Sequence, residues 1–199
     1  MTLVAEHVEP DTRERILVVA ERLFRQIGYQ KTTVADIAKE LRMSPANVYR
    51  FFESKKAIHE GVARILMGEV EGAAQAIRDR EGPAAARLRE LITTINRMNT
   101  ERYVGDNKLH EMVEIAMQES WEVCAAHMLT VTETIAGVIA QGVASGELAV
   151  ADVSLSAMCT CHAMIGYFHP QMIAQSQNKP GPSIDQMIDF VLASLAARR

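Results

Sequence analysis

The fold is decided by residues 28–55, which read GYQKTTVADIAKELRMSPANVYRFFESK. Thr33 precedes a short pattern of apolar residues at helical spacing, and Ser44 followed by Pro45 begins a second one. Only the turn at residues 42–43 separates the two patterns. Two short helices joined by such a turn have the form of a helix-turn-helix, so we expect the second helix to enter the major groove of DNA.

The second helix has one face for packing and one face for DNA. Val48 and Phe52 lie four residues apart and supply the packing face. On the other face, Asn47 suits an adenine edge and Arg50 suits guanine or phosphate, while the hydroxyl of Tyr49 reaches phosphate. Ala46 allows close approach, and residues at helix starts favour phosphate. The predicted DNA-binding residues are Thr33, Ser44, Pro45, Ala46, Asn47, Tyr49, Arg50, Ser54 and Lys55.

This segment resembles the DNA-binding signature of the TetR family of bacterial transcriptional regulators. The matching residues are Gly28-Tyr29-x-x-Thr32-Thr33-Val34-x-x-Ile37-Ala38 and Met43-Ser44-x-x-x-Val48-Tyr49-x-x-Phe52-x-Ser54-Lys55. The resemblance spans residues 16–58. It implies an all-helical homodimer whose three N-terminal helices bind operator DNA and whose C-terminal body binds a small-molecule inducer. Arg42 departs from the pattern, because members often have Gly in this turn.

The charge of the chain is unevenly distributed. The net charge is −4, but residues 12–58 carry ten Lys/Arg and only five Asp/Glu. The rest of the chain, from residue 59, carries eleven basic and seventeen acidic residues. A basic head on an acidic body is expected when only one end of a protein meets phosphates.

Composition and motifs exclude several other classes of protein. The N-terminus is polar and acidic, so it does not read as a signal peptide. No continuous apolar run approaches the ~18 residues of a membrane span. Three cysteines are too few for a secreted disulfide framework. We therefore expect a cytoplasmic protein without a membrane partner. The chain has no G-x-S-x-G, P-loop, G-x-G-x-x-G or H-E-x-x-H motif, so we expect neither enzymatic activity nor a cofactor.

The rest of the chain also reads as helix, because apolar residues recur at helical spacing almost throughout. We expect an all-α protein of about nine helices. It would comprise a helix-turn-helix domain at 1–58 and a helical ligand-binding and dimerisation domain at 59–199. Gly28 should end the first helix, whose apolar stripe is Ile16, Ala20, Leu23, Phe24 and Ile27. Later helices are expected at 55–79, 84–98, 108–117, 120–144, 153–168 and 184–197, with a turn at 103–107 and a loop at 175–183.

The C-terminal body favours an apolar ligand site. Nine of the eleven methionines fall between Met67 and Met187, and methionine adapts to irregular shapes. The expected ligand-binding residues are Tyr103, Met117, Trp121, Met128 and His162, although ordinary core packing would leave the same pattern. The main hypothesis is a repressor released from its operator by a small, mostly apolar molecule. The alternative is a DNA-binding regulator whose body binds a protein partner.

Two further patterns leave alternatives open. The pairs Cys124/His127 and Cys159/His162 have the i, i+3 spacing of one helix face, and would complete a zinc site only if they met. By the family resemblance, the last two helices pair with those of a second subunit. The faces expected to do so are Ala157, Cys161, Ile165 and Phe168 in one helix and Met187, Phe190, Val191 and Leu195 in the other. A core role within one subunit would give the same pattern.

Overall fold

A computed structural model describes residues 11–103, 107–119, 121–176 and 179–197, and the helices in this part of the chain confirm the all-α prediction. The described part contains ten helices. They are α1 (Thr12–Ile27), α2 (Val34–Glu40), α3 (Pro45–Tyr49), α4 (Lys55–Arg78), α5 (Ala84–Tyr103), α6 (Asn107–Glu119), α7 (Trp121–Ala144), α8 (Val153–Phe168), α9 (Pro170–Ser176) and α10 (Ile184–Leu195). The short α9 was not expected, and part of the expected turn at 103–107 lies outside the described residues.

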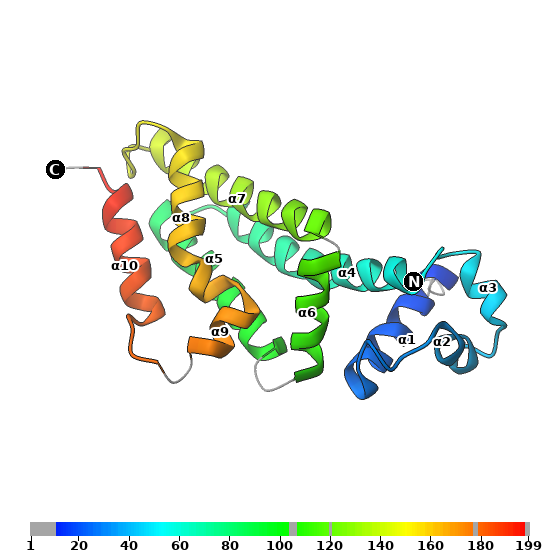
Figure 1. The fold of residues 1–199 in the computed structure, drawn as a ribbon. Coiled ribbons are helices and arrows are strands. Elements are labelled where there is room, and N and C mark those ends of the chain that lie inside the picture. Colours follow the sequence, from blue (N-terminus) through cyan, green and yellow to red (C-terminus); the bar gives the residue numbers. More distant parts are fainter. Residues whose placement is uncertain (1–10, 104–106, 120, 177–178, 198–199) are drawn as a thin grey trace, which may run out of the picture.

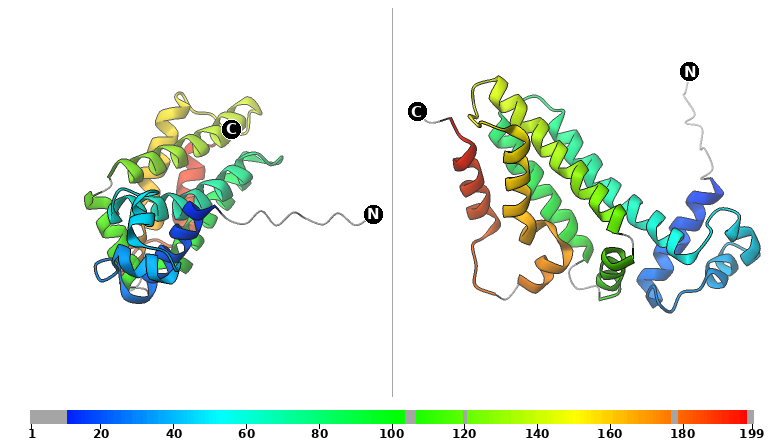
Figure 2. Two further views of the ribbon diagram at one scale, coloured as in Figure 1. Left: turned by 90° about the vertical axis from the view of Figure 1, so that its right-hand side faces the viewer. Right: turned by 45° about the horizontal axis from the view of Figure 1, so that its top comes forward.

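The molecule has a small head and an elongated body (Figure 1). Helices α1–α3 form the head at one end, and α4 runs from the head into the body. There α4, α5, α7 and α8 pack against one another, α6 lies between the body and α1, and α10 covers α5 and α8 at the end far from the head (Figure 2). Because α4 belongs to both parts, it connects the head that would meet DNA with the body that would hold a ligand.

Local capping explains why the head has these helices. Gly28 ends α1 with a φ of 93°, which glycine adopts at little cost. Thr33 forms a capping box with Asp36, and the hydroxyl of Ser44 accepts a hydrogen bond from the main-chain N–H of Asn47. The expected stripe of α1 needs one correction: Leu17 is buried in place of Ile27, which is exposed.

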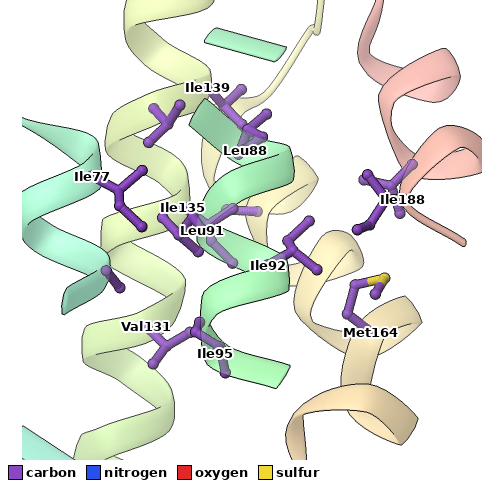
Figure 3. Packing of buried hydrophobic residues seen from close by; sticks show 14 of the residues in the cluster. Ile77, Leu88, Leu91, Ile92, Ile95, Val131, Ile135, Ile139, Met164 and Ile188 are labelled. Atoms are coloured by element: carbon purple, nitrogen blue, oxygen red, sulfur yellow. The ribbon is translucent and has the colours of Figure 1, made fainter. Parts of the chain in front are cut away.

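The core of the body is formed by apolar residues, most of them branched, from the five helices α4, α5, α7, α8 and α10. Figure 3 shows Leu91, Ile92 and Ile95 of α5 between Ile135 of α7 and Met164 of α8. By length and composition alone, α7 would also suit a membrane span, with a mean hydropathy of 1.5 over the window at 122–144. Here it packs between α4 and α8, so its apolar side faces the protein core.

Two polar side chains hold the far end of the body together. The carboxylate of Glu147, in the turn after α7, accepts hydrogen bonds from the first N–H groups of α5, at Ala84 (2.6 Å) and Ala85 (2.9 Å). The buried guanidinium of Arg87 donates to main-chain carbonyls of Arg78 (2.8 Å) and Gly82 (3.1 Å). Glu147 thus satisfies N–H groups at the start of α5, and Arg87 satisfies the last carbonyl of α4 and a carbonyl of the loop that follows it.

Candidate DNA-binding surface and ligand cavity

The short helix α3 presents the predicted residues to solvent. Val48 and Phe52 are buried in the core of the head, as expected. Pro45, Ala46, Tyr49 and Arg50 are exposed and Asn47 is half-buried, and the Tyr49 side chain is 51% accessible. The outward face of α3 therefore offers an aromatic hydroxyl, a guanidinium and an amide on a single short helix.

The helix-start residues differ in how free they are to bind phosphate. Thr33 gives both its main-chain N–H (2.9 Å) and its hydroxyl proton (2.6 Å) to the carboxylate of Asp36, so a phosphate contact would have to replace that pair. Ser44 and Ser54 use only their hydroxyl oxygens, which accept hydrogen bonds from the N–H groups of Asn47 and Ala57. Their hydroxyl protons remain to be donated.

Lys55 makes structural contacts. Its ammonium group donates to the main-chain carbonyls of Tyr29 (3.0 Å), Gln30 (3.3 Å) and Thr32 (3.1 Å). It also lies 4.3 Å from the centre of the Tyr29 ring. Lys55 therefore fixes the loop between α1 and α2 against the start of α4. A phosphate would compete with these carbonyls for its three protons.

Arg42 has a backbone conformation that favours glycine. Its φ is 55°, the only positive φ of a non-glycine residue among the described residues. Two hydrogen bonds close the end of α2 in the pattern of a Schellman motif: the N–H of Arg42 to Lys39 (3.1 Å) and the N–H of Met43 to Ala38 (2.9 Å). The family's frequent glycine at this turn thus has a physical reason, and Arg42 adopts the same geometry at a cost.

A cavity of about 260 Å³ lies in the body between α4, α5, α6, α7 and α8. Four of the five predicted ligand residues line it: Tyr103, Met117, Met128 and His162. The fifth, Trp121, begins α7, but its side chain lies outside the described residues. Further walls come mainly from apolar and sulfur-containing side chains that were not predicted, among them Leu66, Met67, Val70, Met112, Ala116, Cys124, Val131, Met158, Cys161 and Ile165.

His59, which was not predicted, connects the cavity with the head. It lines the cavity, is 1% exposed, and packs against the ring of Tyr29 with 4.6 Å between ring centres. Its Nε2 atom lies 3.1 Å from the main-chain carbonyl oxygen of Met112, and burial lowers the pKa of the imidazole. The sequence held a signal for it, because His59 precedes Val62 and Leu66 at helical spacing on the apolar face of α4.

The alternative of a zinc site finds no support in the geometry. Cys124 is buried and lines the cavity, whereas Cys159 is exposed and does not. The Nδ1 atom of His127 pairs with the carboxylate of Glu71 (2.7 Å), and burial raises the pKa of the Cys124 thiol. Within the described ranges, no three His, Cys, Asp or Glu side chains come together in a metal-binding arrangement.

An apolar face on α8 and α10 is uncovered. The sixteen residues of α8 include no Asp, Glu, Lys or Arg. Leu155, Met158 and Ile165 are exposed on one side of this helix, and Phe190 of α10 is 66% exposed. The expected dimer faces need correction, because Ala157, Val191 and Leu195 pack in the protomer's own core.

Comparisons with known proteins agree over both parts of the chain. A family described as "Bacterial regulatory proteins, tetR family" matches residues 16–62, and a "Tetracyclin repressor-like, C-terminal domain" matches residues 84–186. The HTH-type transcriptional regulator YhgD of Bacillus subtilis is 23% identical over 147 residues, which are 74% of this chain and 77% of YhgD.

Solved structures share the fold. A transcriptional regulator from Cytophaga hutchinsonii has a TM-score of 0.72 and 16% identity, with coverage of 92% of this chain and 98% of that protein. SmeT, the repressor of the Stenotrophomonas maltophilia multidrug efflux pump SmeDEF, has a TM-score of 0.69 and 18% identity, with coverage of 94% and 91% respectively. At these identities the likeness establishes the architecture alone.

Proposed function

Since this chain belongs to the TetR family of DNA-binding transcriptional regulators, we propose that it is a homodimeric repressor released from its operator by a small, mostly apolar molecule. The observation that carries the proposal is the apolar cavity, whose wall includes a residue packed against the head. We retain the assignment to the cytoplasm as part of the proposal.

The DNA contacts we propose start from the outward face of α3. Asn47 and Arg50 read base edges, because amide and guanidinium groups form paired hydrogen bonds with adenine and guanine. Tyr49, Ser44, Ser54, Thr33 and Lys55 hold phosphates, with Thr33 and Lys55 giving up contacts within the head to do so. Pro45 and Ala46 keep the start of the helix small enough for close approach.

Release depends on contacts between the cavity and the head. A ligand shifts an equilibrium only if it binds the two states with different affinity. His59 of α4 and Met112 of α6 both line the cavity. Met112 belongs to the core of the head, and the ring of His59 packs against Tyr29 of that core. A ligand that moves either residue therefore disturbs Tyr29, whose carbonyl helps to hold Lys55. A shift passed from the cavity to Tyr29 in this way would change the positions of the two α3 helices of a dimer.

The apolar face of α8 and α10 supplies the proposed dimer interface. Apolar patches of this kind on a soluble protein mark interaction surfaces. A two-fold axis through this face would present two copies of α3 to two half-sites of a near-palindromic operator. Changing Leu155 to Arg or Phe190 to Lys should give a monomer in light scattering, and Val18→Lys, at an exposed position on α1, is the control. A dimer that survives both changes would place the interface elsewhere.

The DNA assignments are tested by operator selection. The full-length protein is first footprinted on DNA flanking its own gene, and random operators are then selected with Asn47→Ala and Arg50→Ala. Each variant should relax preference at one position per half-site, at about 1–3 kcal/mol per lost paired contact. Tyr49→Ala should weaken binding to all sequences alike. If both variants recover the unaltered operator at reduced affinity, they do not read bases.

A further inference from the structure

The cavity wall has no acidic side chain and no lysine or arginine among its lining residues. The charges beside it already have partners, since Glu71 pairs with His127 and the guanidinium of Arg102 donates to the Leu66 carbonyl (2.8 Å) and pairs with Glu69. An ionised ligand would lose its hydration without gaining a counter-charge, so the wall selects an uncharged molecule.

His59 offers a hydrogen-bond acceptor that the protein does not use. The carbonyl oxygen of Met112 can only accept, so the Nε2 atom of His59 carries a proton and donates it. The lowered pKa keeps the ring neutral, which leaves Nδ1 with a bare lone pair. Nδ1 is buried and has no hydrogen-bond partner in the structure. A buried acceptor without a partner costs free energy that a donor would recover.

Three other polar side chains of the wall already donate to main-chain carbonyls. The amide of Asn99 donates to the Phe168 carbonyl (2.7 Å), and the hydroxyl of Thr132 donates to a carbonyl one turn earlier (2.8 Å). The Nδ1 atom of His162 lies 2.8 Å from the carbonyl of Met158 and must donate to it. These donors of Asn99, Thr132 and His162 are committed to protein carbonyls, while the Nδ1 atom of His59 remains available as an acceptor.

The volume of the cavity limits the size of the ligand. An apolar cavity of about 150 Å³ holds benzene. At about 260 Å³ this cavity has room for an aromatic ring with a short alkyl chain. The methionines in its wall, such as Met67 and Met117, can adjust to the outline of such a group.

We propose that the cavity binds a compact, uncharged, largely apolar molecule bearing a hydroxyl group, and that His59 Nδ1 accepts the hydrogen bond of that hydroxyl. The inference rests on the proposed function, because it names the chemistry of the molecule that would release the repressor. It also places the polar contact on the residue that packs against Tyr29 of the head.

Three matched compounds test the proposal on the full-length protein. They are 4-propylphenol, its methyl ether 4-propylanisole, which lacks the donor, and the anion 4-propylbenzoate. By calorimetry, the phenol should bind at least about tenfold more tightly than either of the others. Equal or tighter binding of the ether or the benzoate would overturn the inference while leaving the ligand-released repressor standing. Binding of none of the three would count against both.

Two variants locate the acceptor. His59→Gln keeps an N–H for the Met112 carbonyl but has no Nδ1 atom, so the ratio of phenol to ether affinity should fall to about one. His110→Gln is the control, because the Nε2 atom of His110 is also buried without a partner, yet this residue does not line the cavity. A ratio that persists in His59→Gln would refute the role of His59. Should that variant fail to fold, the imidazole ¹⁵N shift of Nδ1 in the unaltered protein must change on adding the phenol and not the ether.

Discussion

Replacing Arg42 by Gly should stabilise the head, although it removes a long side chain. At a φ of 55°, an L residue carries a penalty of about 1–2 kcal/mol that glycine does not. Glycine also makes the unfolded chain more flexible, at a cost of about 0.4–1 kcal/mol. The difference predicts that the free energy of unfolding rises by about 0.5–1 kcal/mol. In a chain of 199 residues, this corresponds to about 1–4 °C in Tm.

Arg42→Ala separates this effect from the loss of the guanidinium. Alanine keeps the Cβ atom and therefore the strained backbone, while both hydrogen bonds that close α2 are main-chain bonds and stay in all three proteins. Urea unfolding should place Arg42→Ala within about 0.5 kcal/mol of the unaltered protein and Arg42→Gly above both. A glycine variant no more stable than the alanine variant would show that the positive φ carries no penalty here.

Three more perturbations test other parts of the structure. Lys55→Met should lower the free energy of unfolding by about 2 kcal/mol in urea titrations, because it leaves three loop carbonyls without the ammonium donor. Gly142→Ala should cost about 1–3 kcal/mol by the same measurement, since a Cβ atom there would lie 2.6 Å from Leu148 Cδ1 and 2.7 Å from Ala84 Cβ. Acidification below about pH 6.5 should lower the free energy of unfolding, because burial lowers the pKa of His59 and the unfolded state then binds more protons than the folded state. In thermal melts over the same pH range, His59→Gln should lose less stability than the unaltered protein.

The helix-turn-helix was predictable because its signals are local. Each start and stop in the head depends on residues within one turn: Gly28 at the end of α1, Thr33 with Asp36 before α2, and Ser44 with Pro45 before α3. Such signals do not depend on the rest of the fold. The outward and inward faces of α3 follow in turn from the spacing of Val48 and Phe52 alone.

The missed features depend on context that the sequence does not state. The expected helix at 153–168 ends just before Pro170, and this proline begins the unexpected α9, because proline suits the first position of a helix as well as the residues after one. Glu147 caps α5 across a separation of 63 residues, and Lys55 reaches carbonyls more than 20 residues away. Contacts between residues so far apart in the sequence arise from tertiary packing, and the periodicity of apolar residues does not predict them.

For the cavity, the sequence indicated which types of side chain line it, but not where all of them lie in the chain. Composition pointed to Met117, Met128 and His162, because methionine, aromatic and imidazole groups suit an apolar site with few polar contacts. His59 escaped because it is the first residue of the predicted body domain, next to the head, where the sequence gives no sign of a cavity. A domain boundary inferred from charge and residue usage reflects which residues are on the surface, whereas the residues that line a cavity are decided by how the core packs.

The positions of the two hydrophobic cores, one in the head and one in the body, give a physical reason why a ligand bound in the body would change the structure of the head. The core of the head extends past Ile58 along α4 to Leu66 and also takes Met112 and Ile115 from α6, while the core of the body begins at Val70. The cavity wall draws on both sides of this divide, with Leu66 and Met112 from the first core and Val70 from the second. Close-packed cores repack between discrete arrangements more readily than they deform, so filling a space at their junction favours one arrangement of α4 and α6 over another. A cavity residue in the body's own core, such as Val131, should therefore affect ligand affinity with little effect on operator affinity, whereas Met112 should affect both.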